Sequence, residues 1–177
     1  MRDVQNTRAI DTLETIAPET VKALLISEVV LALGSNYQAK KHLAYVQDKL
    51  VALGEAHYSD AYQNPDFTAT PERPKPDYVN QCVYLRLYQA RTLVALQREF
   101  AALETDCNRC RGALMTTDTV RLVTMDIDTL LIKASDTSAE WQLLSNRMPL
   151  KAHEHIGVTA LLAAMGLSDK GDMVESK

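Results

Sequence analysis

The sequence has no apolar run that approaches the roughly 18 residues needed for a membrane-spanning helix. Its first residues, MRDVQNTRAIDTLE, contain no apolar signal-peptide region. It has only three cysteines, an odd number that does not suggest a disulfide framework. These absences together predict a cytoplasmic protein in a reducing environment.

The sequence also lacks a basic excess and the common nucleotide-binding motifs. The net charge is −4 and the pI is about 5.6, which argues against a sequence-independent nucleic-acid binder. No GxxxxGK[ST] or GxGxxG motif is present, so neither a P-loop nor a Rossmann site is indicated. Small anionic substrates remain compatible with the acidic balance, because a bound metal can supply local positive charge.

The 177 residues, 46% hydrophobic and 24% charged, predict one globular domain with a hydrophobic core. We expect a helical N-terminal extension over residues 1–27, an α+β domain over 28–167 and a tail over 168–177. Apolar residues at helical spacing indicate the extension, and Pro18 is expected to open a second short helix in it. We expect the extension to serve in packing or in the formation of a homodimer.

Hydrophobic periodicity predicts a β-α-β-β-α-β-α order within the domain. The element order matches a ferredoxin-like antiparallel sheet with helices on one side. Residues 64–76 hold four of the six prolines and predict a long loop that could act as a functional lid. The predicted strands are 28–33, 57–63, 77–88 and 120–133, and the predicted helices are 38–53, 92–106 and 153–165.

The most informative stretch of the sequence is Met125-Asp126-Ile127-Asp128, in which apolar and acidic residues alternate. On a strand, Asp126 and Asp128 share one face, where their charges repel. Either water solvates both carboxylates on an exposed face, or a cation lies between them. Mg²⁺ is typically held by one or two carboxylates together with waters and phosphate oxygens.

Three further groups of residues are candidates for binding. Arg109 and Arg111 lie two apart in a loop and could grip phosphate, although solvated loop arginines are an equal alternative. Tyr78 and Asn80 share a strand face and could stack on and hydrogen-bond a flat heterocycle, whereas a core-packed tyrosine is the commoner explanation. Glu104 could join the two aspartates in an acidic cluster if its helix ends over their strand.

Two other functions are weaker alternatives. Cys107 and Cys110 form a CxxC pair, but no second ligand pair stands at suitable spacing, so unpaired thiols are favoured over zinc. Tyrosines on an exposed sheet face could bind RNA, namely Tyr78, Tyr84 and Tyr88. The acidic pI and the lack of a basic stripe oppose that reading.

Four segments resemble the 6-hydroxymethyl-7,8-dihydropterin pyrophosphokinases of folate synthesis, between about residues 28 and 165. They are LALGSN at 31–36, PDYVNQCVYL at 76–85, LETDCNRCR at 103–111 and VTMDIDTLLI at 123–132. The resemblance implies a transferase that uses Mg²⁺ and ATP to move pyrophosphate to the hydroxymethyl group of a pterin. Its implied partners are these two small molecules, without nucleic acid or membrane.

The resemblance also implies roles for individual residues. Asp126 and Asp128 match the pair that holds two Mg²⁺ ions on the ATP phosphates, and Glu104 matches an acid near the nucleotide. Arg109 and Arg111 match the catalytic-loop arginines. The residues that match the pterin side are Tyr78, Asn80, Asn64 and Pro65.

The sequence departs from the family pattern on the nucleotide side. Val123 replaces an arginine, for which Arg121 could substitute. Three more family positions, a histidine, an arginine and a second stacking phenylalanine, carry Leu150, Ile156 and Val158. Two hypotheses therefore stand: an active pyrophosphokinase, or a catalytically degenerate relative that acts as a pterin-binding or interaction module.

Overall fold

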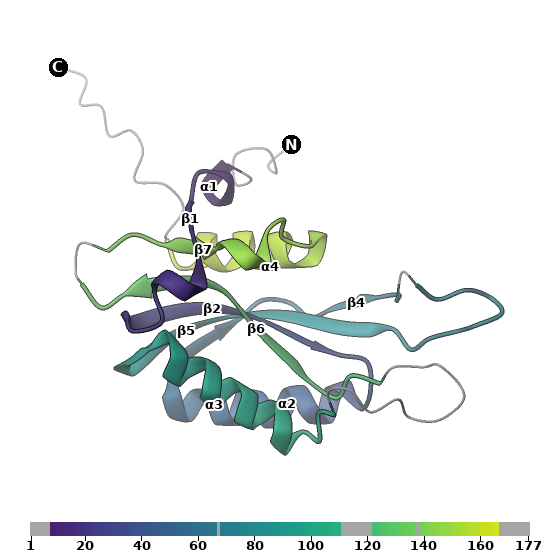
Figure 1. Ribbon diagram of the computed structural model, residues 1–177. Coiled ribbons are helices and arrows are strands. Elements are labelled where there is room, and N and C mark those ends of the chain that lie inside the picture. The colour runs from purple at the N-terminus through teal and green to yellow at the C-terminus, as the bar shows by residue number, and fades with distance from the viewer. Residues whose placement is uncertain (1–7, 67, 111–121, 137–138, 167–177) are drawn as a thin grey trace.

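The computed structural model describes residues 8–66, 68–110, 122–136 and 139–166. One β-sheet lies between two helical layers (Figure 1). Helices α2 (Ala39–Leu53) and α3 (Leu93–Asp106) cover one face, and α4 (Ala152–Ala164) covers the other. These three helices confirm the predicted ones to within a residue or two at each end.

The sheet has seven strands in the order β1-β7-β6-β2-β5-β3, with β4 paired to β5. The β1–β7 pair is parallel and the other pairs are antiparallel. The strands of the predicted β-α-β-β-α-β segment lie in the sheet in the order β6-β2-β5-β3. The assignment of this segment to a ferredoxin-like fold stays a prediction. The strands are β1 (Glu14–Ile16), β2 (Leu25–Ser35), β3 (Gly54–Tyr58), β4 (Tyr62–Asn64), β5 (Tyr78–Thr92), β6 (Asp126–Ala134) and β7 (Gln142–Leu144).

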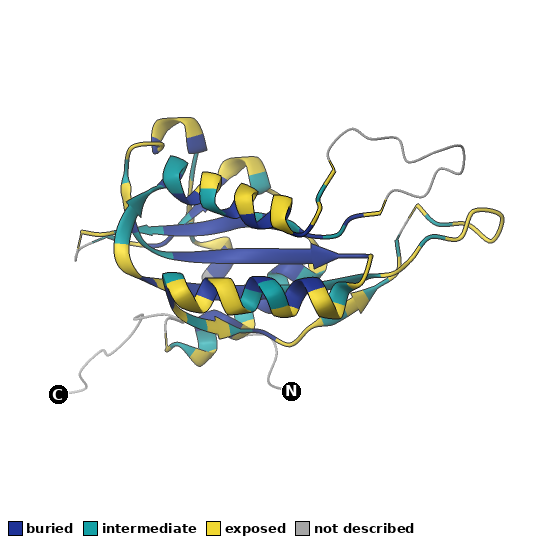
Figure 2. Ribbon diagram, turned by 90° about the horizontal axis from the view of Figure 1, so that it is seen from below, coloured by how far each residue is buried: buried dark blue, intermediate teal, exposed yellow. Residues whose placement is uncertain are grey.

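Both faces of the central strands are buried, so the prediction that helices cover one side only is wrong. Along β2, Leu31 and Leu33 pack toward α2 and α3, whereas Val30 and Ala32 pack toward α4. Two hydrophobic clusters result, one on each face of the sheet, and the helices turn their exposed sides outward (Figure 2). A strand covered on both faces reads as a continuous apolar run, as Val29–Leu33 does.

The described part of the N-terminal segment is not a helical extension. It contains the four-residue helix α1 (Arg8–Asp11), strand β1 and the 3-10 turn η1 (Pro18–Thr20). β1 pairs with β7, a strand that the sequence did not predict. The apolar side chains that suggested a helix instead pack onto the core from several directions, because pairing with a sheet edge overrides local spacing.

Two strand boundaries also differ from the prediction. The strand predicted at 57–63 is divided into β3 and β4, and that predicted at 120–133 begins as β6 at Asp126. Before β6, the backbone N–H of Asn36 donates to the carbonyl oxygen of Val123 at 2.9 Å, and the N–H of Val123 donates to Asn36 Oδ1 at 2.6 Å. Residues 122–125 therefore approach the end of β2 without extending β6.

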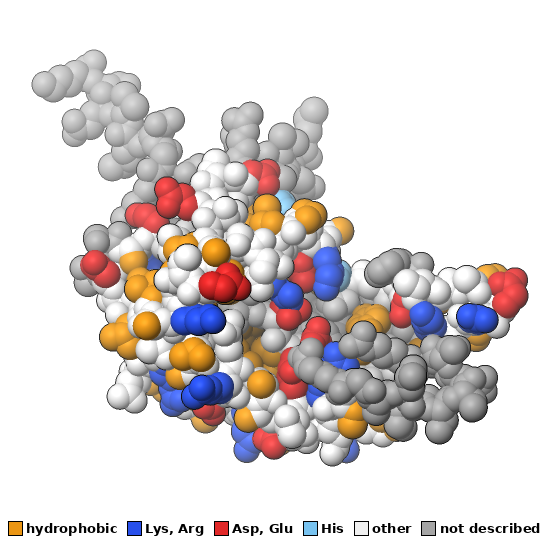
Figure 3. All heavy atoms as spheres, in the orientation of Figure 1, with side chains coloured by type: hydrophobic (Ala, Val, Ile, Leu, Met, Phe, Trp, Pro, Cys, Tyr) orange, Lys and Arg blue, Asp and Glu red, His pale blue; other side chains and the backbone are white. Residues whose placement is uncertain are grey.

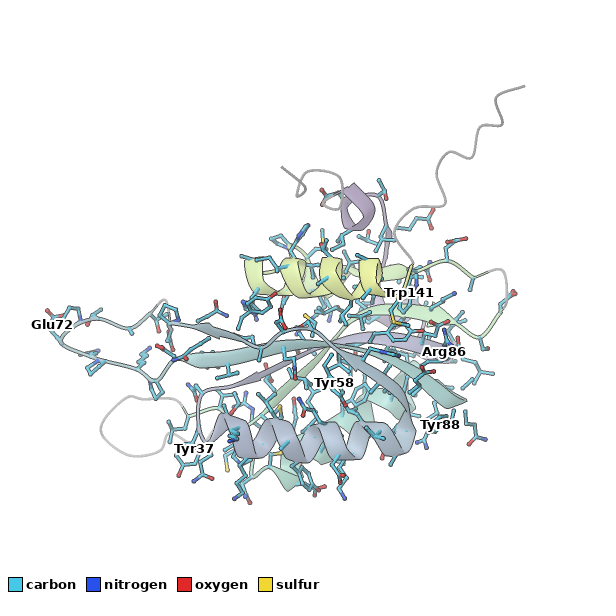
Figure 4. All side chains as sticks on the ribbon, turned by 180° about the vertical axis from the view of Figure 1, so that it is seen from behind. Tyr37, Tyr58, Glu72, Arg86, Tyr88 and Trp141 are labelled. Atoms are coloured by element: carbon cyan, nitrogen blue, oxygen red, sulfur yellow. The ribbon has the colours of Figure 1, made fainter. Side chains whose placement is uncertain are left out.

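The proline-rich loop joins β4 to β5 and projects beyond the helical layers, with Glu72 at its far tip (Figure 4). Within it, Thr70 and Arg73 form an isolated bridge, so the loop folds back as a hairpin. In the same view Trp141 lies on the α4 side of the sheet and Tyr58 on the α2 side. No helix in the described ranges is long and apolar enough to span a membrane.

Candidate functional site

The site is built where β5, β2 and β6 lie side by side. Gly34 of β2 pairs with Asn80 of β5 on one side and with Asp126 of β6 on the other. A Cβ atom on Gly34 would lie 3.0 Å from Asn80 Oδ1, closer than ordinary van der Waals contact. The glycine therefore leaves room for the Asn80 amide beside the acidic strand.

A cavity of about 720 Å³ opens over this row of strands. It is lined by residues from all four segments that resemble the family and from two further stretches, 64–75 and 151–154. Acidic and basic side chains lie next to one another in the hollow of this face, between α4 and the helices beneath the sheet (Figure 3). The predicted residues that line it are Asn64, Pro65, Tyr78, Asn80, Arg109, Asp126 and Asp128.

The Arg109 side chain is buried at this cavity, with 5% of it exposed. Its Nη2 lies 3.6 Å from Asp126 Oδ1. Its Nε and Nη1 have no hydrogen-bond partner within the described chain. Buried guanidinium groups are normally fully hydrogen-bonded, so these two N–H groups are suited to an anionic ligand.

Asp128 forms an ion pair with Arg147, which lies in the 3-10 turn η2 (Ser145–Arg147) after β7. Each side chain is 26% exposed. Asp128 and Arg147 also line a second, smaller cavity of about 170 Å³ on the α3 side, and Asp128 is shared by both cavities. Arg147 was not predicted as a site residue, because this partner of Asp128 comes from a turn that follows an unpredicted strand.

Glu104 does not join the two aspartates in an acidic cluster. It is 4% exposed, and its Oε1 accepts a 2.8 Å hydrogen bond from the backbone N–H of Ile127. The helix end does lie over β6, as expected, but the carboxylate faces the smaller cavity. Across the described residues no three His, Cys, Asp or Glu side chains are grouped to hold a metal ion.

The four positions where the sequence departs from the family pattern are largely withdrawn from the cavities. Val123 is 4% exposed and touches the large cavity with an apolar side chain only. Leu150 and Val158 pack in the cluster beneath α4, and Val158 is fully buried. Ile156 is 51% exposed and lines neither cavity.

The first turn of α4 supplies wall residues that the sequence analysis missed. Lys151, His153 and Glu154 line the large cavity. Glu154 is buried, and its Oε2 accepts a 2.8 Å hydrogen bond from the backbone N–H of Lys151, while Lys151 Nζ lies 3.5 Å from Oε1. Burial lowers the pKa of His153 from 6.5. The available signal was the Lys-Ala-His-Glu run at the start of a predicted helix.

Two predicted site residues, Arg111 and Arg121, lie outside the described residues, so their roles stay predictions. Cys107 and Cys110 form no disulfide, and the preference for unpaired thiols over a zinc site stays a prediction. Cys107 is buried, and burial raises the pKa of its thiol.

The donor set fits Mg²⁺ bound together with a polyphosphate. Asp126 and Asp128 start the same strand two residues apart and both line the cavity. Two carboxylates are too few for an all-protein cage, whereas Mg²⁺ commonly takes its other ligands from water and phosphate. Arg109, with unpaired N–H groups beside them, is placed to contact the same anion.

Comparison with known families identifies one matching family model. No curated protein is similar enough to the chain to count as a match. The family model described as 7,8-dihydro-6-hydroxymethylpterin-pyrophosphokinase matches residues 30–160, which is well over half of the chain and includes every described residue of the large cavity. The chain belongs to the 7,8-dihydro-6-hydroxymethylpterin-pyrophosphokinase family.

Proposed function

We propose that this protein transfers pyrophosphate from ATP to the hydroxymethyl group of 6-hydroxymethyl-7,8-dihydropterin, a step of folate synthesis, with Mg²⁺ as cofactor. Family membership and the shared cavity support this proposal. The observation that carries it is the convergence of Tyr78, Asn80, Arg109 and the two aspartates on one cavity from strands and loops far apart in sequence.

The pterin would bind at the β5 end of the cavity. Tyr78 offers an aromatic face for stacking, and the amide of Asn80 offers both a donor and an acceptor to the edge of the heterocycle. Asn64 and Pro65 close this end from the start of the proline-rich loop. The cavity volume of about 720 Å³ is in the range of small-ligand sites.

The triphosphate would bind at the β6 end. Asp126 and Asp128 hold the magnesium, which would offset charge on the phosphates and polarise the phosphorus under attack. Arg109 donates hydrogen bonds to the phosphoryl oxygens as negative charge builds up on them. We assign Glu104 to the nucleotide side, because it lines the adjoining smaller cavity together with Asp128.

In this reaction the hydroxymethyl oxygen forms a bond to the β-phosphorus of ATP. The bond between that phosphorus and the oxygen bridging it to the α-phosphorus breaks, and AMP leaves with this oxygen. The hydroxyl proton passes to solvent or to a phosphate oxygen. The protein contributes mainly alignment and charge stabilisation, as is general for phosphoryl transfer.

The direct test is AMP release from ATP in the presence of the hydroxymethyl-dihydropterin and Mg²⁺. We expect wild-type protein to release AMP, and Asp126→Ala or Asp128→Ala to lower the rate by about 100-fold or more, since each ~1.4 kcal/mol of lost transition-state binding is tenfold. Asp48→Ala is the matched control, because Asp48 is an exposed residue of α2 that lines neither cavity. Wild-type protein that releases no AMP contradicts the proposal.

A second candidate function is binding without catalysis. It is favoured by apolar side chains at Val123, Leu150 and Ile156, where the family pattern has polar ones, and by Val158, where it has a stacking phenylalanine. Such a protein would bind the pterin through Tyr78 and Asn80 and would have no affinity for ATP. Calorimetry with ATP and Mg²⁺ separates the two functions, because tight, Mg²⁺-dependent ATP binding is expected only of the enzyme.

A further inference from the structure

Each aspartate of the site already has a cationic partner. Asp126 lies against Arg109, and Asp128 against Arg147. The two arginines reach the acidic strand from opposite directions: Arg109 follows the end of α3, and Arg147 follows β7. Charge on the acidic face is therefore offset by two guanidinium groups in the free protein.

Arg147 lines the smaller cavity together with Glu104 and with its partner Asp128. Asp128 also lines the larger cavity, so the ion pair lies where the walls of the two cavities meet. A quarter of the Arg147 side chain is exposed, so it is not fixed by surrounding core atoms.

Arg147 pairs with Oδ2 of Asp128, so a divalent cation bound at that oxygen would compete with the guanidinium. A divalent cation on the carboxylate repels a guanidinium at the same oxygen. An arginine that is displaced in this way lies beside a bound polyphosphate, for which its planar fork is well suited. One position that carries an arginine in the family pattern is Val123 here, whose side chain is apolar and buried.

We propose that Arg147 binds the nucleotide polyphosphate in this protein, and that Asp128 holds it in the free state and releases it when Asp128 takes up a divalent cation. This inference rests on the proposed function. It assigns a phosphate contact to a residue outside the four segments that carry the family resemblance. It also predicts that one substitution has opposite effects on two ligands, which a purely structural role for the ion pair does not.

The experiment compares Arg147→Gln with wild-type protein in two titrations. Mn²⁺ alone, followed by electron paramagnetic resonance, should bind the variant severalfold more tightly, because the competing guanidinium is gone. ATP with Mg²⁺, followed by calorimetry, should bind it about tenfold more weakly, because a charge-assisted hydrogen bond to phosphate is lost. Arg98→Gln, an exposed residue of α3 outside both cavities, should change neither affinity.

Arg147→Lys provides a second variant that keeps the charge. It should recover part of the ATP affinity and bind Mn²⁺ as weakly as wild-type protein. Equal ATP affinity in wild-type and Arg147→Gln overturns the inference while leaving the proposed function intact, and so does a change of both affinities in the same direction. Wild-type protein that binds no ATP with Mg²⁺ overturns both. Should Arg147→Gln fail to fold, an unchanged ATP affinity in Arg147→Lys overturns the inference.

Discussion

The two walls of the large cavity differ in how closely they follow the family pattern. The strand wall, from β5 and β6, presents Tyr78, Asn80, Asp126 and Asp128, four residues that match the family pattern, to the cavity. The wall from the start of α4 keeps none of the expected polar side chains and presents Lys151, His153 and Glu154 instead. Both walls belong to the same cavity, so one cavity combines a wall that matches the family pattern with a wall that departs from it.

The difference follows from what each wall rests on. The strand wall is fixed by backbone pairing, because Asn80, Gly34 and Asp126 are aligned across three adjacent strands. The α4 wall is fixed by side-chain packing, with Val158 buried against the sheet. Packing tolerates substitution of one apolar group for another, whereas strand register admits little change without moving every side chain along it. We therefore expect ligand binding to depend mainly on the strand wall.

The largest effect is expected on the strand wall. Tyr78→Ala should weaken binding of the hydroxymethyl-pterin by about thirtyfold, since stacking and buried aromatic area together contribute about 2 kcal/mol. Tyr78→Phe should retain most of the affinity, because it keeps the ring. Fluorescence titration with the pterin measures both, and Tyr88→Ala is the control, since Tyr88 is 73% exposed on the same strand beyond the cavity. An unchanged affinity in Tyr78→Ala would show that the pterin does not stack there.

On the α4 wall we expect a smaller effect. Lys151→Ala should weaken ATP binding by roughly threefold, because the side chain is 64% exposed and an exposed charge contributes less than about 1 kcal/mol. Calorimetry with ATP and Mg²⁺ measures the change.

A second variant of α4, Ile156→Arg, adds a charge instead of removing one. It restores the residue type of the family pattern at a position that lines neither cavity. We expect it to leave ATP affinity within twofold of wild type. A large gain in Ile156→Arg would mean that the helix turns toward the nucleotide when the ligand binds.

The packing of α4 against the sheet can be tested by substitution of Gly157. A Cβ there would lie 2.6 Å from Cys82 Sγ, so Gly157→Ala requires the helix or the cysteine to move. The helix propensity gained is about 1 kcal/mol and the overpacking cost about 1–3 kcal/mol, so the free energy of unfolding should fall by about 1 kcal/mol. Urea unfolding measures this change, and Cys82→Ala in the same chain should recover part of it. Additive effects of the two substitutions would show that the two residues do not meet.

The strand wall was predictable from sequence and the α4 wall was not, for physical reasons. Alternation around Asp126 and Asp128 determines which side chains share a face, and the four family segments identify their counterparts on β5. The pairing of Asp128 with Arg147 depends on β7, a three-residue strand too short to give a periodic signal. Likewise, coverage of both sheet faces depends on where α4 packs, which periodicity alone does not determine.

The smallest effect concerns the pH dependence of stability at His153. Burial lowers the pKa of this side chain below 6.5, so the unfolded chain binds a proton that the folded chain resists. The stability associated with the neutral ring is therefore complete above pH 6.5 and is lost as the pH falls through the lowered pKa. His153→Gln should flatten this part of the profile while leaving stability at pH 8 nearly unchanged. Thermal melting of both proteins between pH 5 and pH 8 measures the difference, and parallel profiles would mean that His153 is as solvated in the folded protein as in the unfolded chain.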